Sequence, residues 1–165
     1  MKTLVIARHA KSDWPEGVAD INRPLKARGI KDATWLGELL KQQDFLPDHI
    51  ISSPANRARS TAQIIADQVR YGKELEIVES VYYEGAGKLL STIQDLPDKH
   101  ETVMVFGHNP TMENVVRYLL QSDAHYEMPT CGMACFESYG RSWSTFTQHC
   151  RMRWLLVPRL KRKDG

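Results

Sequence analysis

Cysteine is scarce in this chain of 165 residues, and the scarcity excludes two classes of small protein. The three cysteines are Cys131, Cys135 and Cys150, and no C-x-x-C pair occurs. A disulfide framework needs an even number of cysteines, and the pair spaced four apart has no second pair of ligands to complete a zinc site. A chain of this length buries about 70% of its unfolded surface, so its core needs no cross-link. We expect one domain, residues 1–165, in the reducing cytoplasm.

Long apolar runs and an excess of charge are also missing. The apolar stretch at residues 3–7 meets Arg8 and His9 after five residues, too soon for a signal-peptide core or a membrane span. The 22 basic and 20 acidic residues leave a net charge of +2, which gives no chain-wide field for nucleic acid. The basic cluster at residues 159–163 is interpreted as a solubilising terminus, with a nucleic-acid arm as the alternative. The sequence therefore predicts neither a membrane nor a nucleic-acid partner.

Short β-rich runs alternate with segments of helical period through the first 120 residues. The expected strands are residues 3–7, 49–52, 75–78 and 102–106. Apolar residues recur at three and four over residues 26–43, 58–69 and 89–96, and a further helix is expected after Asn109, with that residue as cap and Pro110 at the first helical position. This alternation predicts an α/β fold, a three-layer α/β/α sandwich with a mostly parallel sheet.

The last third of the chain has a different pattern. Residues 132–138, 143–148 and 152–157 are predicted to be strands, the first two joined by a tight turn at Tyr139-Gly140. We expect them to add antiparallel strands to one edge of the sheet. Residues 11–24, rich in Asp, Pro and Gly, form the one long predicted loop.

Polar side chains cluster directly after the predicted strands. In open α/β sheets, ligands bind beyond the carboxyl ends of the strands. The residues found there include Arg8, His9, Lys11 and Ser12 after the first strand, Ser53 and Arg57 after the second, and His108 and Asn109 after the fourth. Guanidinium forks and helix N-termini suit phosphoryl oxygens, so the sequence predicts a phosphate pocket. Without a Gly-rich Walker loop or an aspartate cluster for magnesium, the pocket is expected either to place a side-chain nucleophile at the phosphorus or only to hold the phosphate, and no cofactor is expected.

Of the two histidines, His9 is the better candidate nucleophile. Surrounding cations lower the pKa of its imidazole and keep one nitrogen free of its proton. His108 would stabilise charge on the transferring phosphoryl group, and water would then hydrolyse the phosphoimidazole. Glu84 is either a general acid for the leaving group or a loop carboxylate that pairs with Lys88. Glu79 is a weaker candidate for the acid.

Four sequence blocks resemble one known family. Arg8-His9-Ala10 matches R-H-[GA], residues 52–62 match S-S-P-x-x-R-A-x-x-T-A, Gly107-His108-Asn109-Pro110 matches the second-histidine block, and Arg23-Pro24-Leu25 with Gly29 matches R-P-L-x-x-x-G. Through these blocks the chain resembles the histidine phosphatase superfamily, which has the phosphoglycerate-mutase-like fold, and within it the short SixA-type branch of phosphohistidine phosphatases. The resemblance spans residues 4–158.

The resemblance assigns roles to individual residues. It implies that His9 is the phosphorylated nucleophile, that Arg8, Arg57 and His108 form the phosphate pocket, and that no metal is required. The general acid is less regular in the SixA-type branch, which leaves Glu84 as the candidate. The candidate substrate-binding residues are Lys11, Ser12, Arg23 and Asn109.

The implied activity is that of a cytoplasmic, metal-independent phosphohistidine phosphatase. Its substrate would be a phosphorylated protein, such as a phosphohistidine-containing phosphotransfer protein, or a small phosphorylated molecule. A short chain without helical insertions leaves an open site, which favours the protein. An imidazole leaving group also asks less of an acid than an alkoxide does.

Two other functions compete with this one. Cys135 to Ser142 fits the C-x-x-x-x-x-R-[ST] pattern of cysteine phosphatases, but Glu137 falls inside its would-be phosphate cradle and a strand is predicted to follow. The second competitor is a phosphoprotein-binding adaptor that keeps the pocket without turnover. Because both histidines are present, the enzyme is the favoured interpretation.

Overall fold

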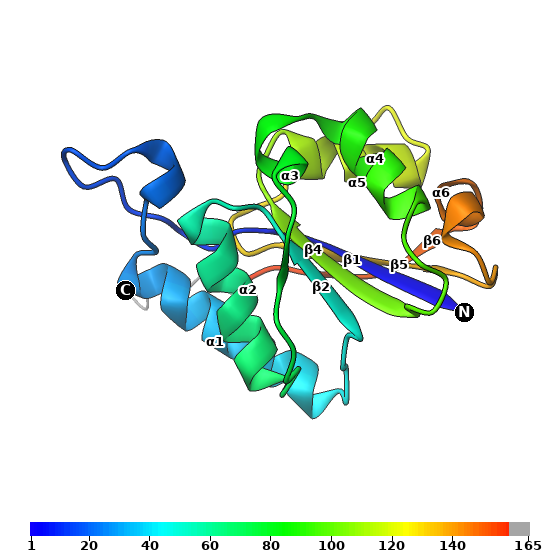
Figure 1. Cartoon of the computed structure of the whole chain (residues 1–165), viewed down its shortest axis with the longest axis horizontal. Helices are drawn as coiled ribbons and strands as arrows, with labels where there is room; N and C mark the ends of the chain where they lie inside the picture. The colour runs from blue at the N-terminus through cyan, green and yellow to red at the C-terminus, as the bar shows by residue number, and fades with distance from the viewer. Residues whose placement is uncertain (159–165) are drawn as a thin grey trace, which may run out of the picture.

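The computed structural model describes residues 1–158, and its centre is a six-stranded sheet (Figure 1). The strands are β1 Lys2–Arg8, β2 His49–Ser52, β3 Glu76–Ile77, β4 Thr102–Gly107, β5 Met133–Ser138 and β6 Arg151–Leu156. Their order across the sheet is β3-β2-β4-β1-β5-β6. The first four of these strands pair in parallel, and β5 and β6 are antiparallel. The predicted sheet and its antiparallel edge are confirmed; the basic cluster at 159–163 lies outside the described residues.

Helices cover both faces of the sheet, which confirms the three predicted layers (Figure 1). One face carries α1 Ala27–Gln42 and α2 Asn56–Gln68, and the other carries α3 Ser80–Tyr83, α4 Ala86–Gln94, α5 Thr111–Leu120 and α6 Phe146–His149. Among residues 1–158, no helix combines the length and the apolar character that a membrane crossing requires.

The central strand β1 is buried on both faces. Leu4 and Ile6 pack in the cluster under α4 and α5, while Val5 and Ala7 pack in the cluster under α1 and α2. All four side chains are fully buried. Strands covered on both faces show continuous apolar runs, which explains why residues 3–7 do not alternate with polar residues. Burial of each larger side chain contributes about 1.5–3 kcal/mol, so the strand that leads to the site is firmly held.

Residues 143–148 do not form the predicted strand. They fold as a 3-10 helix, η2 Trp143–Thr145, that continues into α6. Trp143 and Phe146 are both fully buried, and residues three apart share a face in a helix but not in a strand. The Ser142 side chain caps the segment by accepting a hydrogen bond from the Ser144 N–H.

The start of α5 also differs from its prediction by one place. The helix begins at Thr111, with Pro110 as its N-cap residue. Asn109 does not cap it: its Oδ1 accepts no hydrogen bond from the described residues, while its amide nitrogen donates to the Met128 carbonyl at 3.0 Å and to Glu113 Oε1 at 2.8 Å. The side chain therefore ties the end of β4 to the segment before β5.

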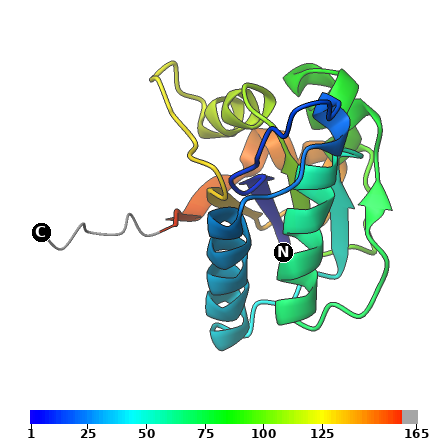
Figure 2. The same ribbon diagram turned by 90° about the vertical axis from the view of Figure 1, so that its left-hand side faces the viewer.

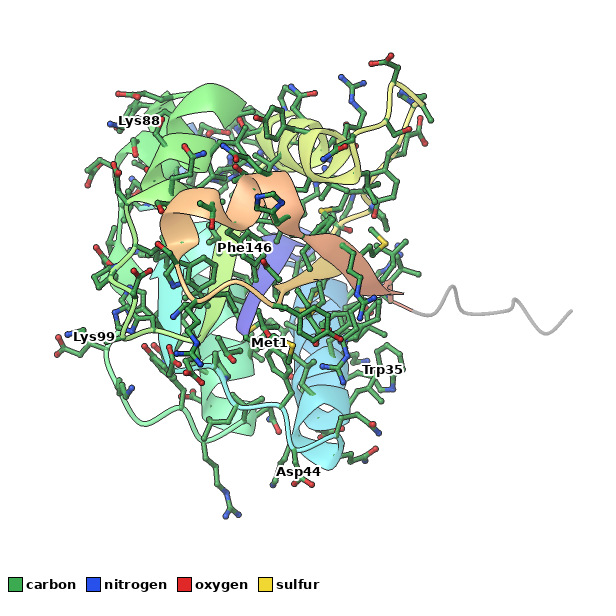
Figure 3. The ribbon with its side chains drawn as sticks, turned by 90° about the vertical axis from the view of Figure 1, so that its right-hand side faces the viewer. Met1, Trp35, Asp44, Lys88, Lys99 and Phe146 are labelled. Atoms are coloured by element: carbon green, nitrogen blue, oxygen red, sulfur yellow. The ribbon has the colours of Figure 1, made fainter. Side chains whose placement is uncertain are left out.

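The carboxyl ends of β1, β4 and β2 meet at one end of the sheet, as the predicted strand adjacency requires. Figure 2 faces this end, where residues 11–24 run across in dark blue as the expected long loop, interrupted by the 3-10 helix η1 Asp20–Asn22. Figure 3 shows the opposite end, where Met1 and Lys99 lie near the starts of β1 and β4. The 11–24 loop and the segments after β1, β2 and β4 supply residues of the candidate site.

Candidate active site

The sheet register brings three chain segments together at the ends of β1, β4 and β2. Arg8 pairs with Gly107 across β1 and β4, and Ser52 pairs with Phe106 across β2 and β4. Beyond these pairs, the His9 N–H donates to the Gly107 carbonyl at 3.0 Å. Parallel strands therefore place the residues after their carboxyl ends on one rim.

A cavity of about 270 Å³ lies at this rim. Its lining residues are Arg8, His9, Lys11, Ser12, Arg23, Arg57, His108, Asn109 and Thr130. Eight of the nine predicted site residues are thus brought together, and the ninth, Glu84, is not among them. The lining is cationic and polar, which suits an anion.

The tautomer of His9 leaves one ring nitrogen unprotonated. Its Nδ1 lies 2.7 Å from the Ala10 carbonyl oxygen, and a carbonyl only accepts, so Nδ1 carries the proton and Nε2 carries the lone pair. The residue is 7% exposed. Burial lowers its pKa to about 3, and the neighbouring charges of His108, Arg57 and Arg8 act in the same direction. The imidazole is therefore neutral at physiological pH.

His108 faces His9 across the site, with ring centroids 5.3 Å apart. Its Nε2 lies 2.7 Å from the Ser53 hydroxyl, which also accepts from the Ala55 N–H. Burial first, and then Arg57, lower the pKa of His108 to about 4. The sequence placed Ser53 after a strand but did not predict that it would orient the second histidine.

Two of the three arginines of the cavity, Arg8 and Arg57, are held by only part of the guanidinium group. Arg8 Nη1 donates to the Met128 carbonyl at 2.9 Å, and Arg57 Nη1 donates to the Asp20 carbonyl at 2.8 Å. Within residues 1–158, the buried Nε atoms of both arginines have no hydrogen-bond partner. A bound oxyanion would supply acceptors that the protein side chains do not.

Asp20 and Tyr82 belong to the site surroundings. Tyr82 follows the third predicted strand, but the sequence assigned no role to it or to Asp20. The Asp20 carboxylate accepts from the Tyr82 hydroxyl at 2.6 Å and from Arg57 Nη2 at 3.1 Å. The Tyr82 bond, followed by Arg57 and Arg23, lowers the pKa of Asp20 to about 2. No motif signals these contacts, because Asp20 lies 37 residues from Arg57 and 62 from Tyr82.

Glu84 lies away from the cavity. It is exposed, and it comes directly after the last residue of α3. No ion pair between Glu84 and Lys88 occurs within the described chain, and Glu79 at the start of the same helix is also exposed. The geometry therefore gives neither carboxylate a contact with the phosphate pocket.

The cysteine pattern that competes with this site is structural. Cys135 is fully buried in β5, and burial raises the pKa of its thiol to about 12. A nucleophilic cysteine needs a thiolate near neutral pH. The segment after the pattern was predicted to be a strand, and it is a helix. A cysteine phosphatase is therefore excluded by the burial of Cys135 and no longer by the segment that follows it.

Comparisons with known proteins identify a family that this chain matches in sequence and in fold. Residues 4–82 match the model of the histidine phosphatase superfamily, branch 1. An uncharacterized protein of Mycobacterium tuberculosis is 32% identical over 154 residues, which are 87% of this chain and 93% of that protein.

Solved structures of similar proteins cover almost the whole chain. A candidate phosphohistidine phosphatase SixA from Agrobacterium tumefaciens is 28% identical, with 95% of this chain and 98% of that chain aligned and a TM-score of 0.78. The protein histidine phosphatase SixA complexed with tungstate shares the fold at 20% identity, with coverages of 94% and 97% and a TM-score of 0.82. The matching motifs line one cavity, and the sequence and fold similarities cover almost the whole chain. The chain therefore belongs to the histidine phosphatase superfamily.

Proposed function

We propose that this protein is a phosphatase that works through a phosphohistidine intermediate on His9, and that its substrate is a protein phosphohistidine. The observation that carries the proposal is the state of His9. Its imidazole is buried and neutral, its proton is held on Nδ1 by the Ala10 carbonyl, and it lines a cavity with three arginines and a second histidine.

The chemistry is determined by that tautomer. The Nε2 lone pair of His9 attacks phosphorus, the bond from phosphorus to the leaving atom breaks, and its electron pair departs with the leaving group. His9 then carries the phosphoryl group on Nε2 while Nδ1–H still donates to Ala10. Water attacks the phosphorus next, the P–N bond breaks, and neutral His9 is regenerated with inorganic phosphate.

Arg8, Arg57 and His108 stabilise the phosphoryl group during both steps. A loose phosphoryl-transfer transition state places charge on three equatorial oxygens, and these residues line the cavity around it. Burial keeps His108 neutral before substrate arrives. A dianionic group in the cavity raises the pKa of His108 and favours its donation to an oxygen.

A protein substrate is supported by the shape of the rim. The cavity is small and polar, and it does not enclose a large ligand. Trp14, stacked on Arg23, and Tyr83, edge-on to Tyr82, are 64% and 67% exposed beside the site. Exposed aromatic side chains of this kind are typical of protein interfaces. The free cysteines are in line with a cytoplasmic enzyme.

The experiment is a phosphatase assay in excess EDTA on phosphohistidine proteins, sugar phosphates and nucleotides at equal concentration. We expect turnover to favour phosphohistidine, and an acid-labile, base-stable phosphoenzyme to be trapped when the reaction is quenched. Replacing His9 by Ala abolishes both signals, whereas Cys135→Ser leaves them unchanged. Binding of the phosphoprotein without turnover would support the adaptor instead, and faster turnover of a sugar phosphate would support a small-molecule phosphatase.

A further inference from the structure

Asp20 places a carboxylate beside the phosphate pocket. Its Oδ2 accepts from the Tyr82 hydroxyl at 2.6 Å and from Arg57 Nη2 at 3.1 Å, and its Oδ1 accepts from Arg23 Nη1 at 3.3 Å. These partners come from α3, α2 and the segment after η1. A carboxylate has about four lone-pair sites, so three hydrogen bonds leave it with further accepting capacity.

The carboxylate lies at the rim, while His9 lies at the floor. The Asp20 side chain is 39% exposed, whereas His9 is 7% exposed. Arg57, which lines the cavity, touches Asp20 through its Nη2 atom. Figure 2 shows η1, in dark blue, beside the N-terminal end of α2 that carries Arg57. Asp20 is not among the residues that line the cavity, but it contacts Arg57 and Arg23, which both line it.

In phosphoryl transfer from a substrate histidine to His9, and then from His9 to water, each imidazole in turn is a leaving group. Each ring therefore needs a proton on the nitrogen that does not carry phosphorus. When the P–N bond breaks, its electron pair returns to the ring nitrogen. The ring leaves as neutral imidazole only if its other nitrogen already carries a proton; otherwise it leaves as a poor imidazolate. His9 meets this demand through Nδ1–H and the Ala10 carbonyl at 2.7 Å. The substrate ring needs an acceptor of its own.

We propose that Asp20 is that acceptor: its carboxylate takes a hydrogen bond from the distal ring N–H of the substrate phosphohistidine and keeps the leaving imidazole protonated. This inference rests on the proposed function and makes Asp20 a specificity-determining residue. The proton belongs to the substrate and stays on it, so no proton passes from Asp20. The product is a neutral histidine of the partner protein.

The charges around Asp20 fit an acceptor and not an acid. The groups that face it are Arg57, Arg23 and Tyr82, with His108 nearby. Together they keep the carboxylate ionised at neutral pH, so it cannot protonate an alkoxide. It can, however, stabilise a ring cation. The same site therefore discriminates against alkyl phosphates, whose leaving oxygen needs a donated proton.

The test is Asp20→Asn, which removes the charge and keeps an oxygen for Tyr82. At about pH 8 the distal ring nitrogen of the free substrate is largely unprotonated, so protonation there depends most on the carboxylate. If the carboxylate raises the pKa of that nitrogen by about one unit, its loss should lower kcat/KM on a phosphohistidine peptide about tenfold or more. At about pH 6 the loss shrinks, because the free substrate is then largely protonated. On p-nitrophenyl phosphate the change stays within about threefold, since an aryl oxide leaves without protonation.

Asp13→Asn is the matched control, because Asp13 is an exposed carboxylate of the same loop whose side chain accepts only from the Trp14 N–H among the described residues. It should leave both substrates unchanged. Equal losses on both substrates in Asp20→Asn would mean that Asp20 only positions Arg57, and a larger loss on an alkyl phosphate would make it a general acid; either result overturns the inference. Wild-type enzyme that cleaves aryl phosphate but no phosphohistidine would instead overturn the proposed substrate.

Discussion

His9 and His108 show how one residue type can serve two roles in one cavity. Nδ1 of His9 is bound to a backbone carbonyl, whereas Nε2 of His108 is bound to the Ser53 hydroxyl. A carbonyl forces one tautomer, but a hydroxyl accommodates a ring nitrogen as donor or acceptor. The proposed function uses this difference: His9 is fixed with a free Nε2 lone pair for attack, and His108 is free to change its protonation when a phosphoryl group arrives.

Replacing His108 by Ala should slow both formation and breakdown of the phosphoenzyme by about 10²- to 10³-fold, the effect of losing one preorganised oxyanion donor. Rapid-quench measurement of the trapped phosphate checks both steps. His125, which is exposed with its side chain 75% accessible, supplies the control, and His125→Ala should match the wild type. A loss in one step alone would contradict the shared role.

Replacing Glu84 by Gln should leave kcat/KM within about twofold on alkyl and aryl phosphates, because an exposed residue outside the cavity has no contact with the leaving group. Steady-state kinetics on both substrates give the answer. A loss confined to the alkyl phosphate would restore Glu84 as the general acid that the sequence suggested.

Residues directly after strands could be predicted, while residues that reach the site from a loop could not. The predicted set of His9, Arg57 and His108 lines the cavity because parallel strands bring the segments after their carboxyl ends together. Asp20 and Tyr82 meet through the path of the 11–24 loop and through α3. Neither path has a local pattern in the sequence, so their contact could only be seen in the structure.

At the scale of elements, the N-terminal turn of α1 supports the loop that lines the site. A Cβ atom added at Gly29 would lie 2.2 Å from the Lys11 carbonyl oxygen and 2.9 Å from the Lys11 nitrogen. The Lys26 N–H donates to that same carbonyl at 2.9 Å. The glycine of the R-P-L-x-x-x-G block is therefore required by the close approach of two backbones.

Gly29→Ala should displace Lys11 and Ser12 from the cavity lining and so raise KM for the phosphorylated substrate. The overpacking should also lower the free energy of unfolding by about 1–3 kcal/mol. Urea unfolding and steady-state kinetics measure the two effects. Gly87 in α4 is the contrasting position, since an added Cβ there meets nothing within 4 Å. Gly87→Ala should instead stabilise the protein by about 0.5–1 kcal/mol, and equal behaviour of the two variants would contradict the packing role of Gly29.

The helix at residues 143–149 shows why one element was mispredicted. The segment contains aromatic and β-branched residues, which favour strands. Burial of both Trp143 and Phe146 overrides that preference, because only a helical turn directs both rings into the same cluster. The neighbouring β5 could be predicted from its apolar run, and β6 from the alternation of exposed and half-buried side chains that is typical of an edge strand.

Across the whole molecule, the buried site should make the fold sensitive to acid. Burial lowers the pKa of His9 to about 3 and that of His108 to about 4. Between these values and the ordinary value of 6.5, the unfolded chain binds protons that the folded chain does not. The free energy of unfolding therefore decreases as the pH falls, by about 1.4 kcal/mol per pH unit for each histidine well below its ordinary pKa.

Urea unfolding at about pH 7 and about pH 5 measures this dependence. His108→Gln should reduce the difference in unfolding free energy between the two conditions, while His125→Gln should not. An unchanged pH dependence in His108→Gln would show that the histidine is not buried in its neutral form.

The division of the site between a sheet and a loop has an evolutionary consequence. His9 and His108 come after strands whose side chains are locked into the core, so substitutions near them disturb folding as well as chemistry. Trp14 belongs to an exposed part of the 11–24 loop, where changes of sequence and length are tolerated. If the proposed function holds, descendants of such a protein can exchange one recognised phosphoprotein for another by changes at Trp14 and its exposed neighbours, while Lys11, Ser12, Asp20 and Arg23 keep their contacts at the cavity.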